Sequence, residues 1–144
     1  MMRITDNFRA AHVMRIKAPP LAEAIVAEHY TLRPELEQRY GGVGRKRCLE
    51  DARFHLHFLA GSVEFGDPRV FADYTAWAVA MLARRRIPAE HVAENVRVMR
   101  RVLDERLPRA VAELGRPHLA AALRALAVTG DQSPGRLDAL SQPP

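Results

Sequence analysis

The chain has 144 residues, of which 48% are hydrophobic and 27% charged, with one cysteine and a net charge of +5. This length and composition are typical of a single globular domain with its own core. One cysteine excludes an internal disulfide and cysteine-rich zinc sites, and no HExxH pair replaces them. No apolar run is long enough to span a membrane, and residues 1–20 lack the apolar core of a secretory signal. We therefore expect a cytoplasmic protein.

The positive charge is spread along the chain. Arginine occurs in every segment and forms no single long tract, and aromatic and basic residues do not alternate. This pattern favours a solvated, arginine-rich surface over a nucleic-acid-binding face. A basic rim around a pocket for an acidic small molecule is the more specific form of the same interpretation.

Helical periodicity runs through the chain, and strand signals are nearly absent. Pro19-Pro20 can open a helix that continues through residues 21–30, because proline is tolerated in a first turn. A short helix over residues 34–40 is predicted to end at Gly41-Gly42.

The longest predicted helix covers residues 43–65 and stops at Gly66. Asp67 is a predicted N-cap for the next helix, which has Pro68 in its first turn and continues through residues 69–85.

Two further helices complete the pattern. The first covers residues 89–107, after a break at Ile87-Pro88. The second covers residues 109–128 and is expected to be interrupted near Gly115 and Pro117.

These elements predict an all-α domain of about six helices over residues 19–129. Residues 1–18 are expected to form an N-terminal extension, and residues 130–144 a flexible C-terminal tail rich in helix breakers. Apolar residues at spacings of three and four predict core-facing stripes in the fourth and fifth helices: Val70, Tyr74, Trp77, Met81, Val92, Val96, Met99 and Leu103.

One strip of the helix over residues 43–65 carries Cys48, Asp51, His55 and Leu59, because residues three and four apart are neighbours. A carboxylate on an inward-facing strip is costly when unpaired, so Asp51 needs donors from the fold or from a ligand. The basic residues 45–47 and the positive end of the helix are expected to lower the pKa of the Cys48 thiol and to attract acidic groups.

Other interpretations of this strip stay open. A lone cysteine is commonly a small buried hydrophobe, and Asp51 could pair with Arg47 or His55 on an exposed face. A catalytic cysteine–histidine pair lacks the loop signatures that accompany such sites. His55 and His57 point to different sides of the helix, so they do not form a metal pair.

Residues 33–74 read RPELEQRYGGVGRKRCLEDARFHLHFLAGSVEFGDPRVFADY. They place a glycine pair, a cysteine, an aspartate three positions later, an aromatic residue, a leucine and a Gly-Asp-Pro turn in one ordered series. This series resembles the middle of the phycobiliproteins, the globin-fold subunits of cyanobacterial light-harvesting antennae. Residues 87–103 are similar to the family's following helix, so the likeness covers about residues 30 to 107.

The resemblance implies a globin-like (phycocyanin-like) fold and a linear tetrapyrrole, or bilin, as ligand. Cys48 would form a thioether to the bilin, and Asp51 would accept hydrogen bonds from the N–H groups of its two central rings. The other residues implied would meet the propionates or line the pocket: Arg45, Arg47, Phe54, His55, Tyr74 and Trp77.

The chain departs from the family pattern at several places. Glu50 stands where the family commonly has a propionate-binding arginine, and His55 replaces one of two paired tyrosines. The segment before Pro19-Pro20 is too short for the long helical hairpin through which antenna subunits pair. The chain is therefore most similar to the bilin biosynthesis-associated globins, which are relatives outside the antennae.

We expect a non-enzymatic binding protein that carries a bilin, supports bilin biosynthesis or acts as a sensor. Its expected partners are a second copy of the chain and, through the resemblance, bilin-making enzymes. Histidine-ligated haem is less favoured, because the helix from Pro68 to Arg86 contains no histidine, which leaves His55 or His57 as ligand. A cofactor-free regulatory module would have a pocket filled by side chains and Asp51 facing solvent or in an ion pair.

Overall fold

The structure is a computed structural model that describes residues 4–130, with the side chains of residues 4–128. Six α-helices follow one another: α1 (Ile4–Ile16), α2 (Ala18–Leu32), α3 (Glu35–Phe65), α4 (Pro68–Ala83), α5 (Ala89–Arg106) and α6 (Arg109–Gly130). No strand occurs within these residues. The predicted all-α architecture of about six helices is confirmed.

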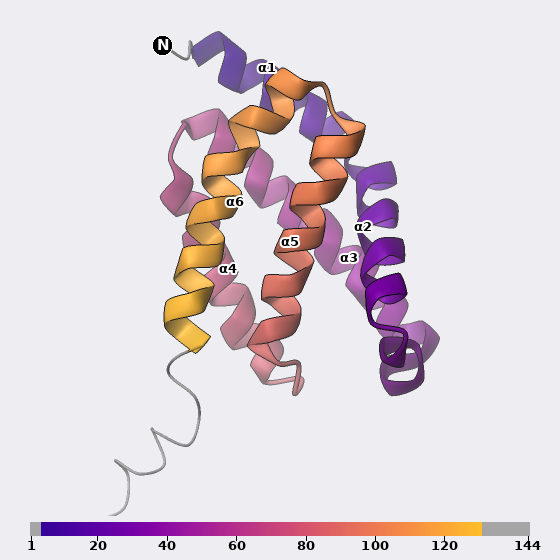
Figure 1. Cartoon of the computed structure of the whole chain (residues 1–144). Coiled ribbons are helices and arrows are strands. Elements are labelled where there is room, and N and C mark those ends of the chain that lie inside the picture. The colour runs from indigo at the N-terminus through magenta and orange to yellow at the C-terminus, as the bar shows by residue number, and fades with distance from the viewer. Residues whose placement is uncertain (1–3, 131–144) are drawn as a thin grey trace, which may run out of the picture.

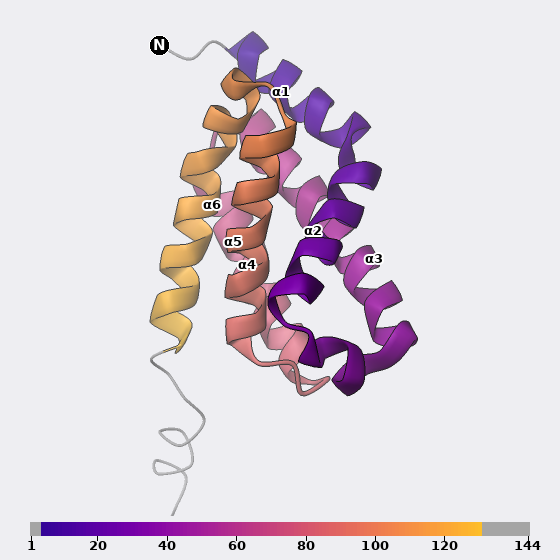
Figure 2. The ribbon, with the colours of Figure 1, turned by 45° about the vertical axis from the view of Figure 1, so that its right-hand side comes forward.

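Helix α1 crosses one end of the bundle that α2 to α6 form (Figure 1). It packs on α3 and α6, while α4 packs on α3, α5 and α6, and α2 packs on α3 and α5. The end of α2, the start of α3 and the turn between α4 and α5 lie at the opposite end of the bundle (Figure 2). That end holds the candidate functional site.

Several helix boundaries lie where the sequence predicts them. The Asp67 carboxylate accepts a hydrogen bond of 3.0 Å from the backbone N–H of Arg69, and Pro68 occupies the first position of α4. Pro19-Pro20 lies in the first turn of α2. Gly66, with φ 67°, ends α3 in the left-handed conformation that glycine tolerates.

The predicted break at Gly41-Gly42 is a kink within α3. Gly41 has φ 64° and ψ −167°, a combination that essentially only glycine adopts. The short and the long predicted helices are therefore two arms of α3 that meet at Gly41. Gly44 follows in the long arm, and a Cβ atom there would collide with Tyr40 of the short arm.

The N-terminal segment is part of the packed domain. Residues 1–18, expected to form an extension, contain α1, in which Ala10, Ala11 and Met14 are fully buried. Arg15 of α1 forms an ion pair with Glu64 of α3. Small alanine side chains let α1 lie close to α3, but they produce only a weak amphipathic pattern in the sequence. The predicted tail lies outside the described residues, apart from Gly130 at the end of α6.

The expected interruption of the last helix is wrong, because α6 continues through Gly115 and Pro117. A proline inside a helix removes one backbone hydrogen bond. Tertiary contacts on either side hold the helix together here. Met14 approaches Gly115 so closely that a Cβ atom at Gly115 would lie 3.2 Å from Met14 Cε, and His118 bonds to α3.

Ser62 connects α3, α4 and α6 through one buried hydroxyl. The hydroxyl donates to the Asp67 carbonyl at 2.8 Å, accepts from the Phe71 N–H at 3.2 Å and lies 2.6 Å from His118 Nδ1. Because its only proton goes to Asp67, the His118 ring donates to Ser62. Burial lowers the pKa of His118, which is consistent with a neutral ring at this position.

We expect Ser62→Ala to lower the free energy of unfolding by about 1–3 kcal/mol, because the Phe71 N–H and the His118 ring lose their buried hydrogen-bond partner. Urea unfolding followed by circular dichroism measures this change. The control is Thr31→Ala, which removes an exposed hydroxyl that donates to the Ala27 carbonyl at 2.9 Å and should change stability by less than about 0.5 kcal/mol. Equal effects of the two substitutions would contradict the role given to Ser62.

Candidate functional site

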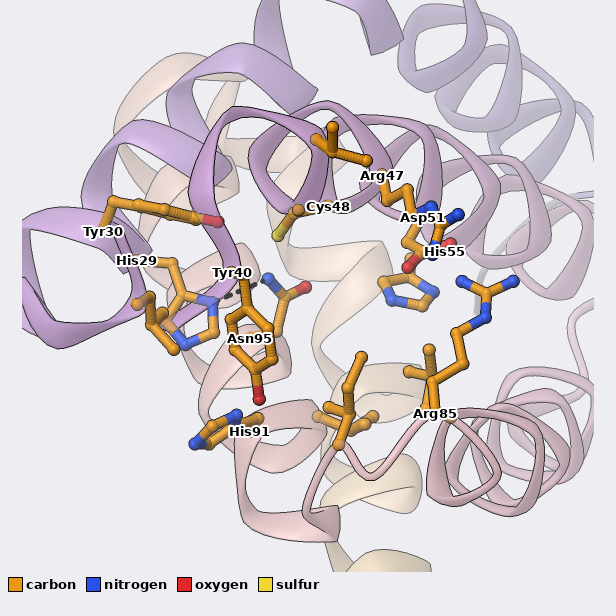
Figure 3. A pocket seen from close by; sticks show the side chains of 16 residues that line it. His29, Tyr30, Tyr40, Arg47, Cys48, Asp51, His55, Arg85, His91 and Asn95 are labelled. Carbon is orange, nitrogen blue, oxygen red and sulfur yellow. Dashed lines mark hydrogen bonds between the residues drawn. The ribbon is translucent and has the colours of Figure 1, made fainter. Parts of the chain in front are cut away.

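A cavity of about 220 Å³ opens at the end of the bundle away from α1. Its walls come from α2, both arms of α3, the end of α4, the turn after α4 and α5, and Figure 3 shows the side chains that line it. The kink at Gly41 contributes directly, because Tyr40 lies before it and Val43 after it in the lining.

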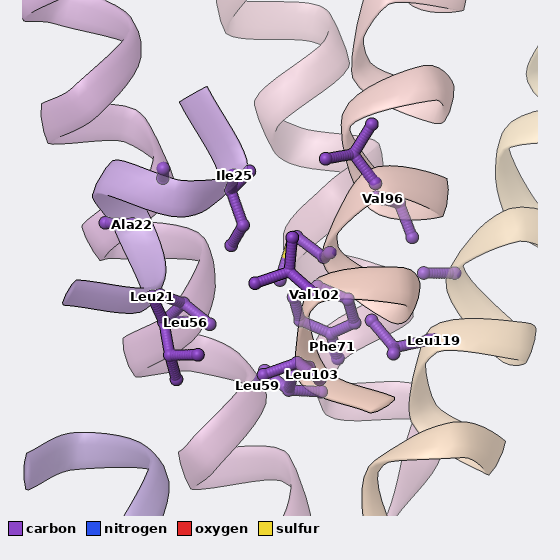
Figure 4. Close-up of a cluster of buried hydrophobic side chains, with 14 of the residues drawn as sticks. Leu21, Ala22, Ile25, Leu56, Leu59, Phe71, Val96, Val102, Leu103 and Leu119 are labelled. Atoms are coloured by element: carbon purple, nitrogen blue, oxygen red, sulfur yellow. The ribbon is translucent and has the colours of Figure 1, made fainter. Parts of the chain in front are cut away.

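The predicted strip of α3 faces this cavity. Cys48, Asp51 and His55 all line it, and Leu59, one turn further along α3, is fully buried in the core. Leu56 and Leu59 pack among side chains from the neighbouring helices, including Leu21 of α2 and Phe71 of α4 (Figure 4). Core packing along one end of α3 thus fixes the direction in which the strip points at the other end.

The pKa of Cys48 differs from the sequence expectation. The basic residues 45–47 were expected to lower the pKa of the thiol, but burial raises it to about 11, and the negative charge of Asp51 adds to this rise. Arg45 acts in the opposite direction and is outweighed. Cys48 is therefore a protonated thiol at neutral pH, because desolvation exceeds the attraction of exposed cations.

Asp51 has no partner within the part of the chain that the structure describes. Its carboxylate forms neither a hydrogen bond nor an ion pair. Asp51 therefore pairs neither with Arg47 nor with His55, the two partners that the sequence left open. Burial raises the pKa of Asp51, and the charges of Arg85 and Arg47 offset this only partly, while Glu50 raises it further. The result is a half-buried acid that lacks donors, on the wall of an open cavity (Figure 3).

His55 is held by a tyrosine behind the cavity wall. Its Nδ1 atom lies 2.8 Å from the hydroxyl of Tyr74, which is buried and does not line the cavity. The Tyr74 ring in turn stacks on Phe58, with ring centroids 4.0 Å apart. Burial lowers the pKa of His55 to about 4, so the ring is neutral at pH 7. Tyr74 therefore orients His55 and does not contact the cavity itself.

Besides Tyr74, three residues implied by the resemblance do not line the cavity. Arg45 pairs with Glu37 at 3.2 Å and covers the Tyr30 ring, while Phe54 and Trp77 are 60% and 58% exposed on outer surfaces. Each residue of a helix is turned by about 100° from the one before it, which places Arg45 and Phe54 to either side of the strip. Arg47 does line the cavity, as expected.

The core-facing stripe predicted for α5 is confirmed, whereas the one predicted for α4 is confirmed only in part. In α5 the four predicted residues, Val92, Val96, Met99 and Leu103, are all buried. In α4 Tyr74 is buried, but Trp77 is exposed, so this part of the α4 prediction is wrong. Trp77 lies beside Tyr74, with ring centroids 6.0 Å apart, at the solvent edge of the same stripe.

Sequence reasoning missed the residues that complete the cavity from other elements. Five of them are polar: Arg85 in the turn after α4, Tyr40 beside the kink, His29, His91 and Asn95. A signal existed for Asn95, because an amide on the apolar face of α5 is buried between valines and needs a polar partner. Buried atoms without a hydrogen bond occur at three of these residues: His29 Nε2, Tyr40 OH and Asn95 Oδ1.

Within the described residues, no group of three or more metal-ligating side chains is placed to hold an ion. No described helix is both long enough and apolar enough to cross a membrane.

Comparisons with known proteins found no relative of this chain. No protein-family model matches the sequence, and neither a curated protein nor a solved structure shows significant similarity to it. The likeness to phycobiliproteins described for residues 30 to 107 therefore enters the functional argument only as a proposal.

Proposed function

We propose that the chain is a non-enzymatic, globin-like protein that binds a linear tetrapyrrole in the cavity between α2, α3 and α5. One observation carries the proposal. The Asp51 carboxylate is half-buried in the cavity wall, one helical turn from Cys48, and has no hydrogen bond or ion pair within residues 4–128. Pyrrole N–H groups of a ligand would supply the donors that a buried carboxylate requires.

Two arginines support an anionic ligand. Arg47 and Arg85 line the same cavity, and neither guanidinium group forms an ion pair or hydrogen bond with another described residue. Figure 3 shows both arginines at the cavity, from two different elements of the fold. Cations without partners at a pocket attract carboxylates, and a bilin carries two propionates.

The size of the cavity limits how much of the ligand is enclosed. Its volume of about 220 Å³ is below the roughly 300 Å³ at the lower end of small-molecule pockets. We propose that the cavity encloses part of the open chain of rings around Asp51 and that the rest lies along the mouth. When bound, the pigment would absorb visible light, and the protein would fix the conformation and the protonation state of the pigment.

The alternatives account less well for Asp51. The four nitrogens of haem bind iron and donate no hydrogen bond, so Asp51 would stay without a partner. A cofactor-free regulatory module was expected to have a filled pocket and Asp51 paired or facing solvent. The open cavity and the unpaired, half-buried Asp51 favour a ligand with N–H groups.

Titration with biliverdin tests this proposal. We expect a new or shifted visible absorption band, and Asp51→Asn should weaken binding by about 10-fold to 100-fold, because a hydrogen bond to a charged group contributes about 1.5–3 kcal/mol. The band should also shift to the blue, because the substitution removes the carboxylate that stabilises the protonated form of the pigment.

Glu50→Gln is the matched control for this titration, because it removes a neighbouring carboxylate that is exposed and does not line the cavity. It should leave the affinity nearly unchanged. A wild-type protein whose spectrum does not change with biliverdin, a phytobilin or haemin would refute tetrapyrrole binding.

The reactivity of Cys48 gives a separate prediction. With a pKa of about 11, roughly one thiol in ten thousand is ionised at pH 7. Cys48 should therefore react with a disulfide reagent far more slowly than a free cysteine, and its rate should still rise at pH 10. Asp51→Asn should accelerate the reaction, because it removes a charge that raises the pKa of the thiol.

Glu50→Gln again serves as the control, because Glu50 does not contribute to the pKa shift of Cys48. A wild-type rate equal to that of free cysteine would show that the thiol is activated. The same chemistry makes any thioether to a bilin slow to form, so we expect binding to begin non-covalently. An acid-stable, zinc-fluorescent adduct should then accumulate over time and be absent in Cys48→Ala.

A further inference from the structure

A relay of polar side chains leads from the surface to the part of the cavity wall that α5 supplies. Arg33 Nε donates to both carboxylate oxygens of Glu94, at 3.0 and 2.9 Å. Glu94 Oε1 lies 3.5 Å from His29 Nε2. His29 Nδ1 lies 3.2 Å from the amide nitrogen of Asn95, which lines the cavity (Figure 3). Glu94, His29 and Asn95 are all buried.

The relay determines which way the Asn95 amide faces. Burial lowers the pKa of His29 and outweighs the opposing effect of Glu94, so the ring is neutral and carries one proton. The separation of 3.5 Å from Glu94 is long for a hydrogen bond, but the negative charge still holds the ring proton on Nε2. Nδ1 is then an acceptor, and it takes a hydrogen bond from the NH₂ group of Asn95.

This orientation leaves the Asn95 oxygen without a donor. Asn95 is only 6% exposed, yet its Oδ1 atom has no hydrogen-bond partner in the described part of the chain. In Figure 3 the oxygen points away from His29, toward the middle of the side chains that line the cavity. Buried carbonyl groups normally find a donor, so an unpaired one aimed into a cavity calls for a donor from a ligand.

We propose that Asn95 is a specificity-determining residue that selects ligands with an N–H group at its end of the cavity. The inference rests on the proposed tetrapyrrole-binding function and deepens it. Asp51 on α3 takes N–H groups of the central rings, and Asn95 on α5 takes the N–H of a terminal lactam ring. Arg33 and Glu94 are positioning residues, because they do not line the cavity and act through His29 on the Asn95 amide. His29 lines the cavity and also positions Asn95.

A pair of related ligands tests the role of Asn95. The first is biliverdin, and the second is its lactim methyl ether, in which each terminal N–H is replaced by an acceptor nitrogen. We expect the wild-type protein to bind biliverdin at least about 10-fold more tightly than the ether. In the complex with the ether, an acceptor nitrogen would face the Asn95 oxygen, which is also an acceptor. Asn95→Leu keeps the branched arrangement of the side-chain heavy atoms and removes the amide, so it should lose most of this preference. Absorbance titrations measure all four affinities.

Thermal unfolding of Asn95→Leu separates recognition from structure. The substitution leaves His29 Nδ1 without its donor, but it also removes an unpaired buried carbonyl and adds apolar contacts. Because these effects oppose each other, we expect the melting temperature to stay close to that of the wild type. Loss of stability with unchanged ligand preference would instead identify Asn95 as a structural residue and overturn the proposal.

A second variant tests the relay in the absence of ligand. Long-range ¹H–¹⁵N NMR should find the His29 proton on Nε2 in the wild type, and Glu94→Gln should shift protons to Nδ1 and reduce the preference for biliverdin. Asp104→Asn is the control, because Asp104 is also an acid of α5 that pairs with an arginine, Arg116, at 3.3 Å. It does not line the cavity and should change neither reading.

The outcomes separate this inference from the function on which it rests. If Asn95→Leu keeps the full preference for biliverdin, the role of Asn95 is wrong while tetrapyrrole binding stands. A His29 proton found on Nδ1 in the wild type also overturns the relay. If the wild-type protein binds neither ligand, the proposed function fails and the role of Asn95 falls with it.

Discussion

A half-buried carboxylate without a partner is the feature on which this account depends. Burial raises the pKa of Asp51, and the nearest positive charges, Arg85 and Arg47, do not reach it with a hydrogen bond or an ion pair. A carboxyl group with a raised pKa holds its proton more tightly in the folded protein than in the unfolded chain, so its ionisation reduces the free energy of unfolding as the pH rises above its usual pKa. Perturbed acids of this kind cluster at sites that bind or react with ligands.

The architecture maintains this arrangement from several directions. Leu56 and Leu59 anchor α3 in the core, so the strip with Cys48 and Asp51 cannot turn away from the cavity. Gly41 kinks the helix and brings its short arm to the other side of the opening. Ser62 ties the far end of α3 to α4 and α6. The closely packed core thus lies beside the cavity, and polar atoms without partners belong to residues on its walls.

Much of the fold was predictable from local signals. Prolines and glycines mark helix ends, and the i, i+3, i+4 spacing places Cys48, Asp51 and His55 on one wall, as the structure confirms. Residues contributed by other elements were not predictable in the same way. Arg85 and Asn95 meet the strip only through tertiary packing, which a pattern along one helix does not contain. The prediction that the pKa of Cys48 is lowered was wrong for a related reason. Nearby basic residues can be read from the sequence, but the depth of burial, which raises this pKa, cannot.

The most direct measurement follows the Asp51 carboxyl carbon by ¹³C NMR over a pH titration, with and without biliverdin. We expect a pKa above the usual range for aspartate in the free protein, because of burial. Binding should then lower this pKa, because N–H donors stabilise the ionised form. A pKa that is already low in the free protein, or that stays the same when biliverdin binds, would contradict the claim that Asp51 awaits donors from a ligand.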